Sequence, residues 1–169
     1  MLEVVIVKKE EKQILMNLIE KYEYDFSKYT LADVNNLGLF GYDYLDHYFV
    51  EENRFAYFVK VDGFLAGFVM INDYPEVKTE KTDYCISEFF ILSKYRRQGI
   101  GKKVVFEILN KHRGRWMLKR HPKNVDSVLF WDNVINDYTK GNFTLIKAHP
   151  DESIAYEDGS LADVIFFDN

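Results

Sequence analysis

The chain has 169 residues, enough for one domain with a substantial core, and its 47% hydrophobic and 17% aromatic content excludes a disordered protein. No apolar run approaches the roughly 20 residues that span a bilayer, and the N-terminus lacks a signal-peptide pattern, so we expect a cytoplasmic protein without membrane contact. A net charge of -5 argues against nucleic acid, which normally requires a basic domain or a broad basic stripe.

Positive charge is concentrated in one stretch of the chain. Residues 94–123 hold 11 of the 22 basic residues and one acid, Glu107, so the remainder has 11 basic and 26 acidic residues, a formal charge of -15. A basic segment in an otherwise acidic chain suits a compact polyphosphate ligand, because such a ligand needs local positive charge only.

The cysteine and the histidines indicate neither a disulfide nor a metal site. The single cysteine, Cys85, lies within an apolar run with no neighbouring base, so we expect a buried structural thiol. The four histidines, at 47, 112, 121 and 149, show no metal-ligand spacing with cysteines or carboxylates.

The N-terminal third begins with regular elements and continues with an aromatic segment. Residues 4–7 are typical of a strand, and residues 10–22 place apolar side chains on one face of a helix. Residues 24–48 are rich in aromatic residues, with a second short helix predicted across residues 42–48. This segment either lines a substrate pocket or packs under a loop.

A hairpin, a loop and the central strand follow. Residues 54–61 and 64–71 flank Asp62-Gly63, a pair that suits the positive dihedral angles of a type I′ turn. After a charged loop up to residue 83, residues 84–92 form an apolar run of strand length.

The central strand leads into a basic turn and a helix. Five basic residues and no acid occur from Lys94 to Lys103, and apolar residues recur from Ile100 at helical spacing. Gly99 and Gly101 leave the backbone N–H groups of the first turn uncovered at the positive end of the helix dipole. This pattern favours a pyrophosphate site. The alternative is a tight turn whose basic residues form a solvated face.

The rest of the chain completes one α/β domain over residues 1–169. Gly114 is a stop for the basic helix, residues 115–120 form a strand, and residues 124–138 form a mostly apolar helix. This succession implies a right-handed parallel crossover. Residues 143–148 and 162–167 are predicted as closing strands, which gives the order β-α-α-β-β-β-α-β-α-β-β.

Two short motifs stand out, on the basic turn and on the helix that begins near residue 124. Residues 96–101 read Arg-Arg-Gln-Gly-Ile-Gly, and residues 124–131 carry Asn, Ser, Phe and Trp at the spacing N-x-x-S-x-x-F-W. They resemble the R/Q-x-x-G-x-G/A and N-x-x-A-x-x-F-Y motifs of the GNAT superfamily of N-acetyltransferases. The resemblance implies a mixed, centrally splayed α+β sheet flanked by helices, with acetyl-coenzyme A (acetyl-CoA) in the resulting cleft.

The resemblance also assigns cofactor contacts. It implies that the backbone at Phe90 and Ile91 pairs with the pantetheine arm as an added strand, and that the amides of residues 97–102 hold the pyrophosphate. The side chains of Arg96, Arg97 and Lys102 would add positive charge, and Asn124 would hydrogen-bond the pantetheine. The expected cofactor-binding residues are Phe90, Ile91, Leu92, Arg96, Arg97, Gln98, Gly99, Ile100, Gly101, Lys102, Asn124, Ser127, Phe130 and Trp131.

Catalysis is predicted to depend on Glu88, the only acid in the apolar strand, because an isolated carboxylate there has a raised pKa and can act as a base. Alternatively, Glu88 pairs with a basic residue or faces solvent. Trp131 replaces a tyrosine that serves many family members as general acid, and an indole N–H cannot supply that proton. In that case either the thiolate leaves without a proton donor, or another hydroxyl, such as that of Tyr138 or Ser127, acts as the acid. Alternatively, Trp131 has only a structural role and lines the pantetheine channel.

The function implied is an N-acetyltransferase, an acyltransferase for groups other than aminoacyl groups, that acts by direct attack in a ternary complex. The acceptor is a small-molecule or peptidyl amine, and the acidic body favours a cationic one. One alternative is a non-catalytic CoA-binding sensor or interaction module, motivated by Trp131. Another, a nucleotide-binding domain, is disfavoured because Val104 stands where G-x-G-x-x-G requires glycine. Both a monomer and a homodimer are compatible with the sequence.

Overall fold

In the computed structural model, which describes residues 1–169, seven strands form one mixed sheet in the order β1-β2-β3-β4-β5-β7-β6. The strands are β1 (Leu2–Ile6), β2 (Phe55–Val61), β3 (Phe64–Asn72), β4 (Tyr84–Ile91), β5 (Arg115–Arg120), β6 (Thr144–Ile146) and β7 (Asp163–Asp168). The helices are α1 (Lys12–Thr30), α2 (Ile100–Lys111) and α3 (Val125–Thr139), with the 3-10 helices η1 (Lys9–Glu11), η2 (Leu45–Phe49), η3 (Ser93–Tyr95) and η4 (Glu152–Ile154).

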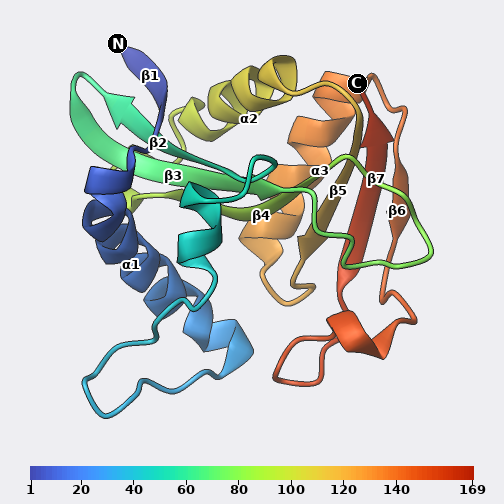
Figure 1. The fold of residues 1–169 in the computed structure, drawn as a ribbon. Coiled ribbons are helices and arrows are strands. Elements are labelled where there is room, and N and C mark those ends of the chain that lie inside the picture. The colour runs from blue at the N-terminus through green and yellow to red at the C-terminus, as the bar shows by residue number, and fades with distance from the viewer.

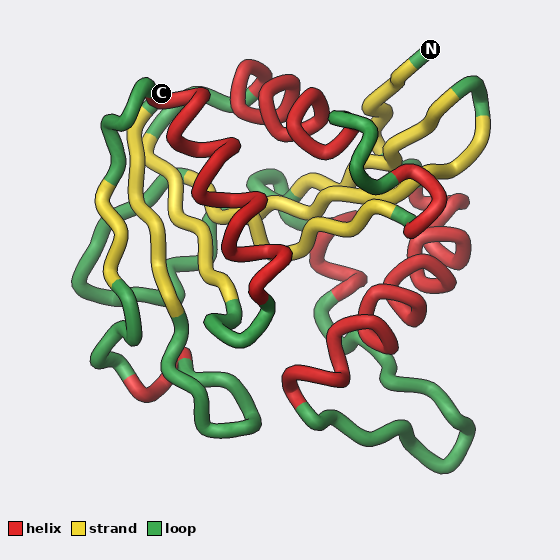
Figure 2. The backbone as a smooth tube through the Cα atoms, turned by 180° about the vertical axis from the view of Figure 1, so that it is seen from behind, coloured by secondary structure: helices red, strands yellow, loops and turns green.

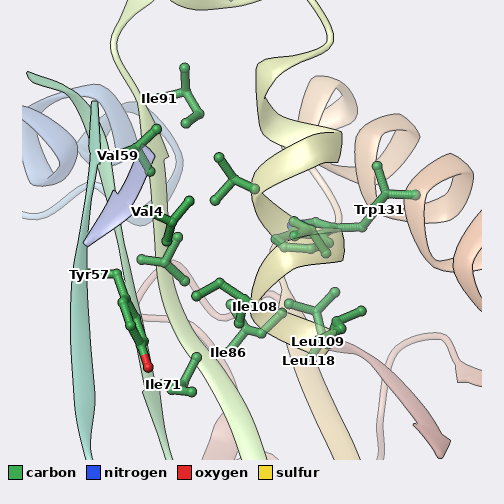
Figure 3. Packing of buried hydrophobic residues seen from close by; sticks show 14 of the residues in the cluster. Val4, Tyr57, Val59, Ile71, Ile86, Ile91, Ile108, Leu109, Leu118 and Trp131 are labelled. Atoms are coloured by element: carbon green, nitrogen blue, oxygen red, sulfur yellow. The ribbon is translucent and has the colours of Figure 1, made fainter. Parts of the chain in front are cut away.

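Helices cover both faces of this sheet (Figure 1 and, from behind, Figure 2). On one face, Leu15 and Ile19 of α1 are fully buried against Phe58 of β2 and Phe68 of β3. On the other face, α2 and α3 pack with the opposite side chains of the same strands, and Figure 3 shows Ile108 of α2 within that cluster. Each such buried side chain stabilises the fold by about 1.5–3 kcal/mol.

The predicted hairpin is confirmed. Strands β2 and β3 are joined by Asp62 and Gly63, whose φ angles of 51° and 80° are both positive, as a type I′ turn requires. Cys85 of β4 is buried, as expected, and burial raises the pKa of its thiol well above the ordinary value.

Two predictions for the N-terminal third need correction. Helix α1 ends at Thr30 rather than Tyr22, because Phe26 and Tyr29 continue its apolar stripe and the first left-handed residue is Leu31, at φ 62°. The predicted second helix is only the short 3-10 helix η2. No helix of the chain has the length and apolar content needed to cross a membrane.

The sheet opens between its two central strands. Strands β4 and β5 are parallel, but only residues 84–86 of β4 pair with residues 116–118 of β5. Beyond Ile86, β4 continues along β3 to Ile91 while β5 continues along β7, and Figure 1 shows β4 and β5 running apart. From Ser87 onward, the edge of β4 that faces β5 therefore has no strand partner.

Candidate functional site

A β-bulge lies at the point where β4 leaves β5. In the ladder between β3 and β4, Met70 pairs with Glu88 and Ile71 pairs with Ile86, so Ser87 is an extra residue. The extra residue resets the alternation of side chains along β4. As a result, Glu88 faces the α1 side of the sheet.

A buried polar network holds the bulge. The Ser87 hydroxyl donates to the carbonyl of Met70 at 3.0 Å and lies 2.7 Å from the Tyr48 hydroxyl of η2. The side-chain amide of Asn72 in turn donates to the Tyr48 hydroxyl at 3.1 Å. Tyr48 and Asn72 are both buried, so this network fixes the backbone next to Glu88.

Glu88 is half-buried and is not ion-paired. Its pKa is raised to about 7, chiefly by burial; hydrogen bonds from Tyr22 and Tyr42 act to lower this pKa, and the negative charge of Glu23 acts to raise it. The Tyr42 hydroxyl donates to Glu88 Oε1 at 3.2 Å. A carboxyl group with this pKa can accept and release a proton near neutral pH, which is what a general base requires.

The tyrosines around Glu88 stay protonated. The pKa values of Tyr22, Tyr42 and Tyr156 are all raised, chiefly by burial and also by the negative charge of Glu88. Tyr22 and Tyr42 therefore act toward Glu88 as hydrogen-bond donors, not as bases. Sequence reasoning did not predict these two contacts, because Tyr22 and Tyr42 come from separate segments of the chain.

The turn after β4 presents a row of free backbone donors. Arg97 and Gly99 both have left-handed φ angles, 61° and 73°, and no side chain caps the N-terminus of α2. None of the six consecutive amides from Arg97 to Lys102 donates a hydrogen bond within the protein. The first bonded amide is that of Lys103, which donates to Gly99. Such a row at the positive end of a helix suits an anion.

The basic side chains of this turn already have carboxylate partners. Arg97 pairs with Asp126 and Lys102 pairs with Asp137, each at 2.6 Å and each from α3. Arg97 and Asp126 are largely exposed and Lys102 and Asp137 are about half exposed, so solvent weakens both pairs. A bound anion can therefore replace Asp126 and Asp137 as the ion-pair partner of Arg97 and Lys102.

The Arg96 side chain is bonded to β4 and to α1. Its Nε group donates to the carbonyl of Ile91 at 2.6 Å, and its guanidinium pairs with Asp25 of α1 at 2.7 Å. Arg96 therefore ties the end of β4 to α1. This arrangement does not support the predicted contact between Arg96 and the pyrophosphate.

Of the two residues predicted to pair with the pantetheine arm, only Ile91 directs its backbone groups to the open edge, and its carbonyl there already accepts the hydrogen bond from Arg96. The Phe90 carbonyl faces β3, since a Cβ atom on Gly67 would lie 2.0 Å from it. Backbone groups alternate between the two edges of a strand, so Phe89 and Ile91 share the edge opened toward β5. Phe89 and Ile91, and not Phe90, are therefore the residues whose backbone faces the side on which an added strand could lie.

Three elements meet closely at Phe130. A Cβ atom on Gly101 of α2 would lie 3.0 Å from the Phe130 ring of α3, which itself stacks on Phe89 of β4 with ring centroids 5.5 Å apart. Trp131 is 5% exposed and packs on Phe89 at 5.2 Å. Trp131 thus belongs to the core beside the open edge. The absence of a side chain at Gly101 allows Phe130 to pack closely against α2.

Asn124 begins α3, as the motif predicts. Its Oδ1 atom accepts the backbone N–H of Ser127 at 3.2 Å, and its Nδ2 group makes no hydrogen bond within the protein. Tyr138 lies at the opposite end of the same helix, where its hydroxyl donates to Asn110 at 2.9 Å. The hydroxyl predicted as a possible acid toward the thiolate is therefore engaged with Asn110 of α2, at the end of α3 remote from Asn124.

A groove of about 710 Å³ begins beside the free amides and follows the exposed face of α2. Its lining includes Gly99, the lysines Lys102, Lys103 and Lys111, and one acid, Glu107, which pairs with Lys111 at 2.7 Å, with Phe106 as its hydrophobic residue. The groove lies away from Glu88, so it can extend an anion site but cannot contain the reacting groups.

The sequence model of the family described as Acetyltransferase (GNAT) family matches residues 15–133, more than half of the chain. The chain belongs to this family. Acetyl-CoA is the cofactor of GNAT acetyltransferases, and it is therefore the cofactor expected here. A comparison with curated proteins found no match.

Solved structures share the fold over nearly the whole chain. An acetyltransferase from Thermus thermophilus has a TM-score of 0.69 at 15% identity, covering 99% of this chain and 97% of its own. A GNAT acetyltransferase from Streptococcus pneumoniae has a TM-score of 0.64 at 14% identity and full coverage of both chains. Spermidine N-acetyltransferase from Vibrio cholerae, solved with CoA and spermine, has a TM-score of 0.61 at 12% identity, covering 98% and 94%. The predicted GNAT fold is thereby confirmed.

The site of this GNAT acetyltransferase fits its cofactor. The free amides of residues 97–102 match a pyrophosphate, and the open edge of β4 matches the amide groups of a pantetheine arm. Both features lie on elements that meet at Phe130, so one extended ligand can contact them together.

Proposed function

We propose that this GNAT acetyltransferase transfers an acetyl group to a primary amine by direct attack in a ternary complex, with Glu88 as general base. The observation that carries the proposal is the position of Glu88. It follows the bulge at which β4 leaves β5, and it titrates near pH 7. Lys119, the cation that acts on it, is paired with Glu76 at 2.7 Å, which leaves the Glu88 carboxylate without an ion-pair partner.

Bound acetyl-CoA would supply an acetyl group activated as a thioester. In this proposal the amides of residues 97–102 hold its pyrophosphate, and Arg97 and Lys102 exchange their aspartate partners for it. The β4 edge would pair with the pantetheine arm through the backbone of Phe89 and the N–H group of Ile91, whose carbonyl is bonded to Arg96. Asn124 donates to that arm through Nδ2, while the α2 groove receives the nucleotide end.

An acceptor nitrogen bound as an ammonium group loses one proton to Glu88, which frees the lone pair that forms the new bond to the acetyl carbon. The same nitrogen releases its second proton to solvent as the bond from the acetyl carbon to sulfur breaks. Hydrogen bonds from Tyr22 and Tyr42 orient the carboxylate before the first proton transfer and become weaker once it is protonated. Because Trp131 has no hydroxyl group, its side chain could not supply a proton to the thiolate of coenzyme A. Glu88 then returns its proton to solvent.

We further propose that the acceptor is cationic, as a polyamine, an aminoglycoside or a peptidyl amine would be. The pKa of Glu23 is raised to about 7, chiefly by burial and also by the negative charges of Glu20 and Glu157. Together with Glu88, these carboxyl groups make the α1 side of the site negative, opposite in sign to the turn that precedes α2. A bound cation would stabilise their ionised forms.

A panel of amines tests the proposal by release of free thiol from acetyl-CoA. We expect turnover with amines that carry a second positive charge and weak turnover with amines that carry a carboxylate beside the nitrogen. Tight cofactor binding without thiol release for any acceptor would instead support the non-catalytic CoA-binding module.

A further inference from the structure

The segment that carries Tyr42 is attached to α1 through one carboxylate. Residues 31–44, between α1 and η2, contain no helix or strand. Near its end, Glu20 of α1 accepts the backbone N–H of Phe40 through Oε2 at 3.0 Å and that of Gly41 through Oε1 at 2.8 Å. Both carboxylate oxygens are therefore used on consecutive amides, an arrangement that fixes position and direction together.

This attachment lies directly beside the contact with the base. Gly41 has a φ of 77°, a left-handed angle that turns the chain at this point, and the next residue is Tyr42. The Tyr42 hydroxyl then donates to Glu88 Oε1 at 3.2 Å. The path from Glu20 to Glu88 thus contains two backbone hydrogen bonds, one turn and one tyrosine side chain.

We propose that Glu20 is a positioning residue, which places the Tyr42 hydroxyl on Glu88 by holding the amides of Phe40 and Gly41. The inference rests on the proposed role of Glu88 as base and adds a residue that touches neither the cofactor nor the acceptor nitrogen. In this proposal, residues 31–44 influence the reaction, because a displacement of Tyr42 would change the hydrogen bond to Glu88.

A positioning role and a purely electrostatic role predict opposite changes at Glu88. If Glu20 acted through its charge, its removal would lower the pKa of nearby carboxyl groups, since a negative neighbour disappears. If Glu20 acts through Tyr42, its removal takes a donor from the ionised form of Glu88 and raises that pKa. The titratable groups that face Glu88 are Tyr22 and Glu23 of α1, Tyr42, Tyr48 of η2, Cys85 of β4, Lys119 of β5 and Tyr156.

The experiment follows the Glu88 carboxyl by NMR in protein labelled with ¹³C-glutamate, with Glu88→Gln used to assign its signal. We expect Glu20→Ala and Tyr42→Phe each to raise its titration midpoint by about one pH unit, because each removes the same bond to an ionised group. The double variant should shift no further than the larger single change. Glu10→Gln, an exposed acid in η1, is the control for charge alone and should leave the midpoint unchanged.

A midpoint that stays or falls in Glu20→Ala, or single shifts that add in the double variant, would overturn the proposal. Glu20→Gln, which keeps one acceptor oxygen, should give a smaller shift in the same direction and replaces Glu20→Ala if that variant fails to fold. The pH at which kcat falls on the acidic side of its pH profile, the acid limb, is measured in parallel for the same variants. Shifted midpoints with an unshifted acid limb would leave the role of Glu20 intact and refute Glu88 as the base.

Discussion

Replacing Glu88 by glutamine keeps the size of the side chain and removes its ability to accept a proton. With a pKa of about 7 in the folded protein, Glu88 is about one-tenth ionised at pH 6 and about nine-tenths ionised at pH 8. If the ionised form is the base, kcat/KM for the acceptor rises about tenfold across this range. A carboxyl group with the ordinary pKa of 4.5 would change by only a few per cent over the same interval.

The assay is the initial rate of thiol release at saturating acetyl-CoA from pH 5.5 to pH 9 for wild type and Glu88→Gln. We expect the variant to lose roughly 10² in kcat or more, and to lose the rise near pH 7. Ionisation of the acceptor amine adds a second rise, which both proteins should share. A variant that keeps the rise near pH 7, or more than about half of its activity at pH 8, would refute the role of Glu88.

Three further predictions concern the surroundings of Glu88 and of the free amides. Between about pH 4.5 and pH 7 the folded protein keeps a proton on Glu88 that the unfolded chain has released, so its stability falls as the pH rises through this window. Glu88→Gln should remove this fall, worth at most about 3 kcal/mol, so its melting temperature should exceed that of wild type at pH 8 but not at pH 4.5. Asp137→Asn frees Lys102 and should lower KM for acetyl-CoA about two- to fivefold at low salt; an unchanged KM would contradict the proposed exchange of partners. Ser87→Ala removes the hydroxyl between Met70 and Tyr48 and should lower kcat while KM for acetyl-CoA stays constant, whereas equal changes in both would mean a general loss of structure.

Much of the cofactor side of the site follows from local sequence. An apolar strand, a basic turn and helical spacing from Ile100 are properties of neighbouring residues, and they predicted β4 and α2 closely. Asn124 at the start of α3 was likewise predictable, because an N-cap side chain bonds its own helix. These features need no knowledge of how distant segments pack.

The acceptor side depends on long-range packing and could not be predicted in this way. No sequence pattern marks Ser87 as a bulge, yet that extra residue decides which face Glu88 occupies. The direction of the Phe90 carbonyl depends on the register with Gly67, and the contact of Tyr42 with Glu88 joins residues 46 positions apart. Only the length of α1 had a usable signal, since Tyr22, Phe26 and Tyr29 continue its stripe at helical spacing.

The central claim is direct transfer to an amine, and a single-turnover experiment tests it most directly. Protein loaded with acetyl-CoA is mixed with the cationic amine that gives the fastest thiol release, and mass spectrometry follows the acetyl group. We predict that the acetyl group appears on the amine at the rate of thiol release and never on the protein. An acetylated protein that forms before the product, or thiol release without an acetylated amine, would contradict the account.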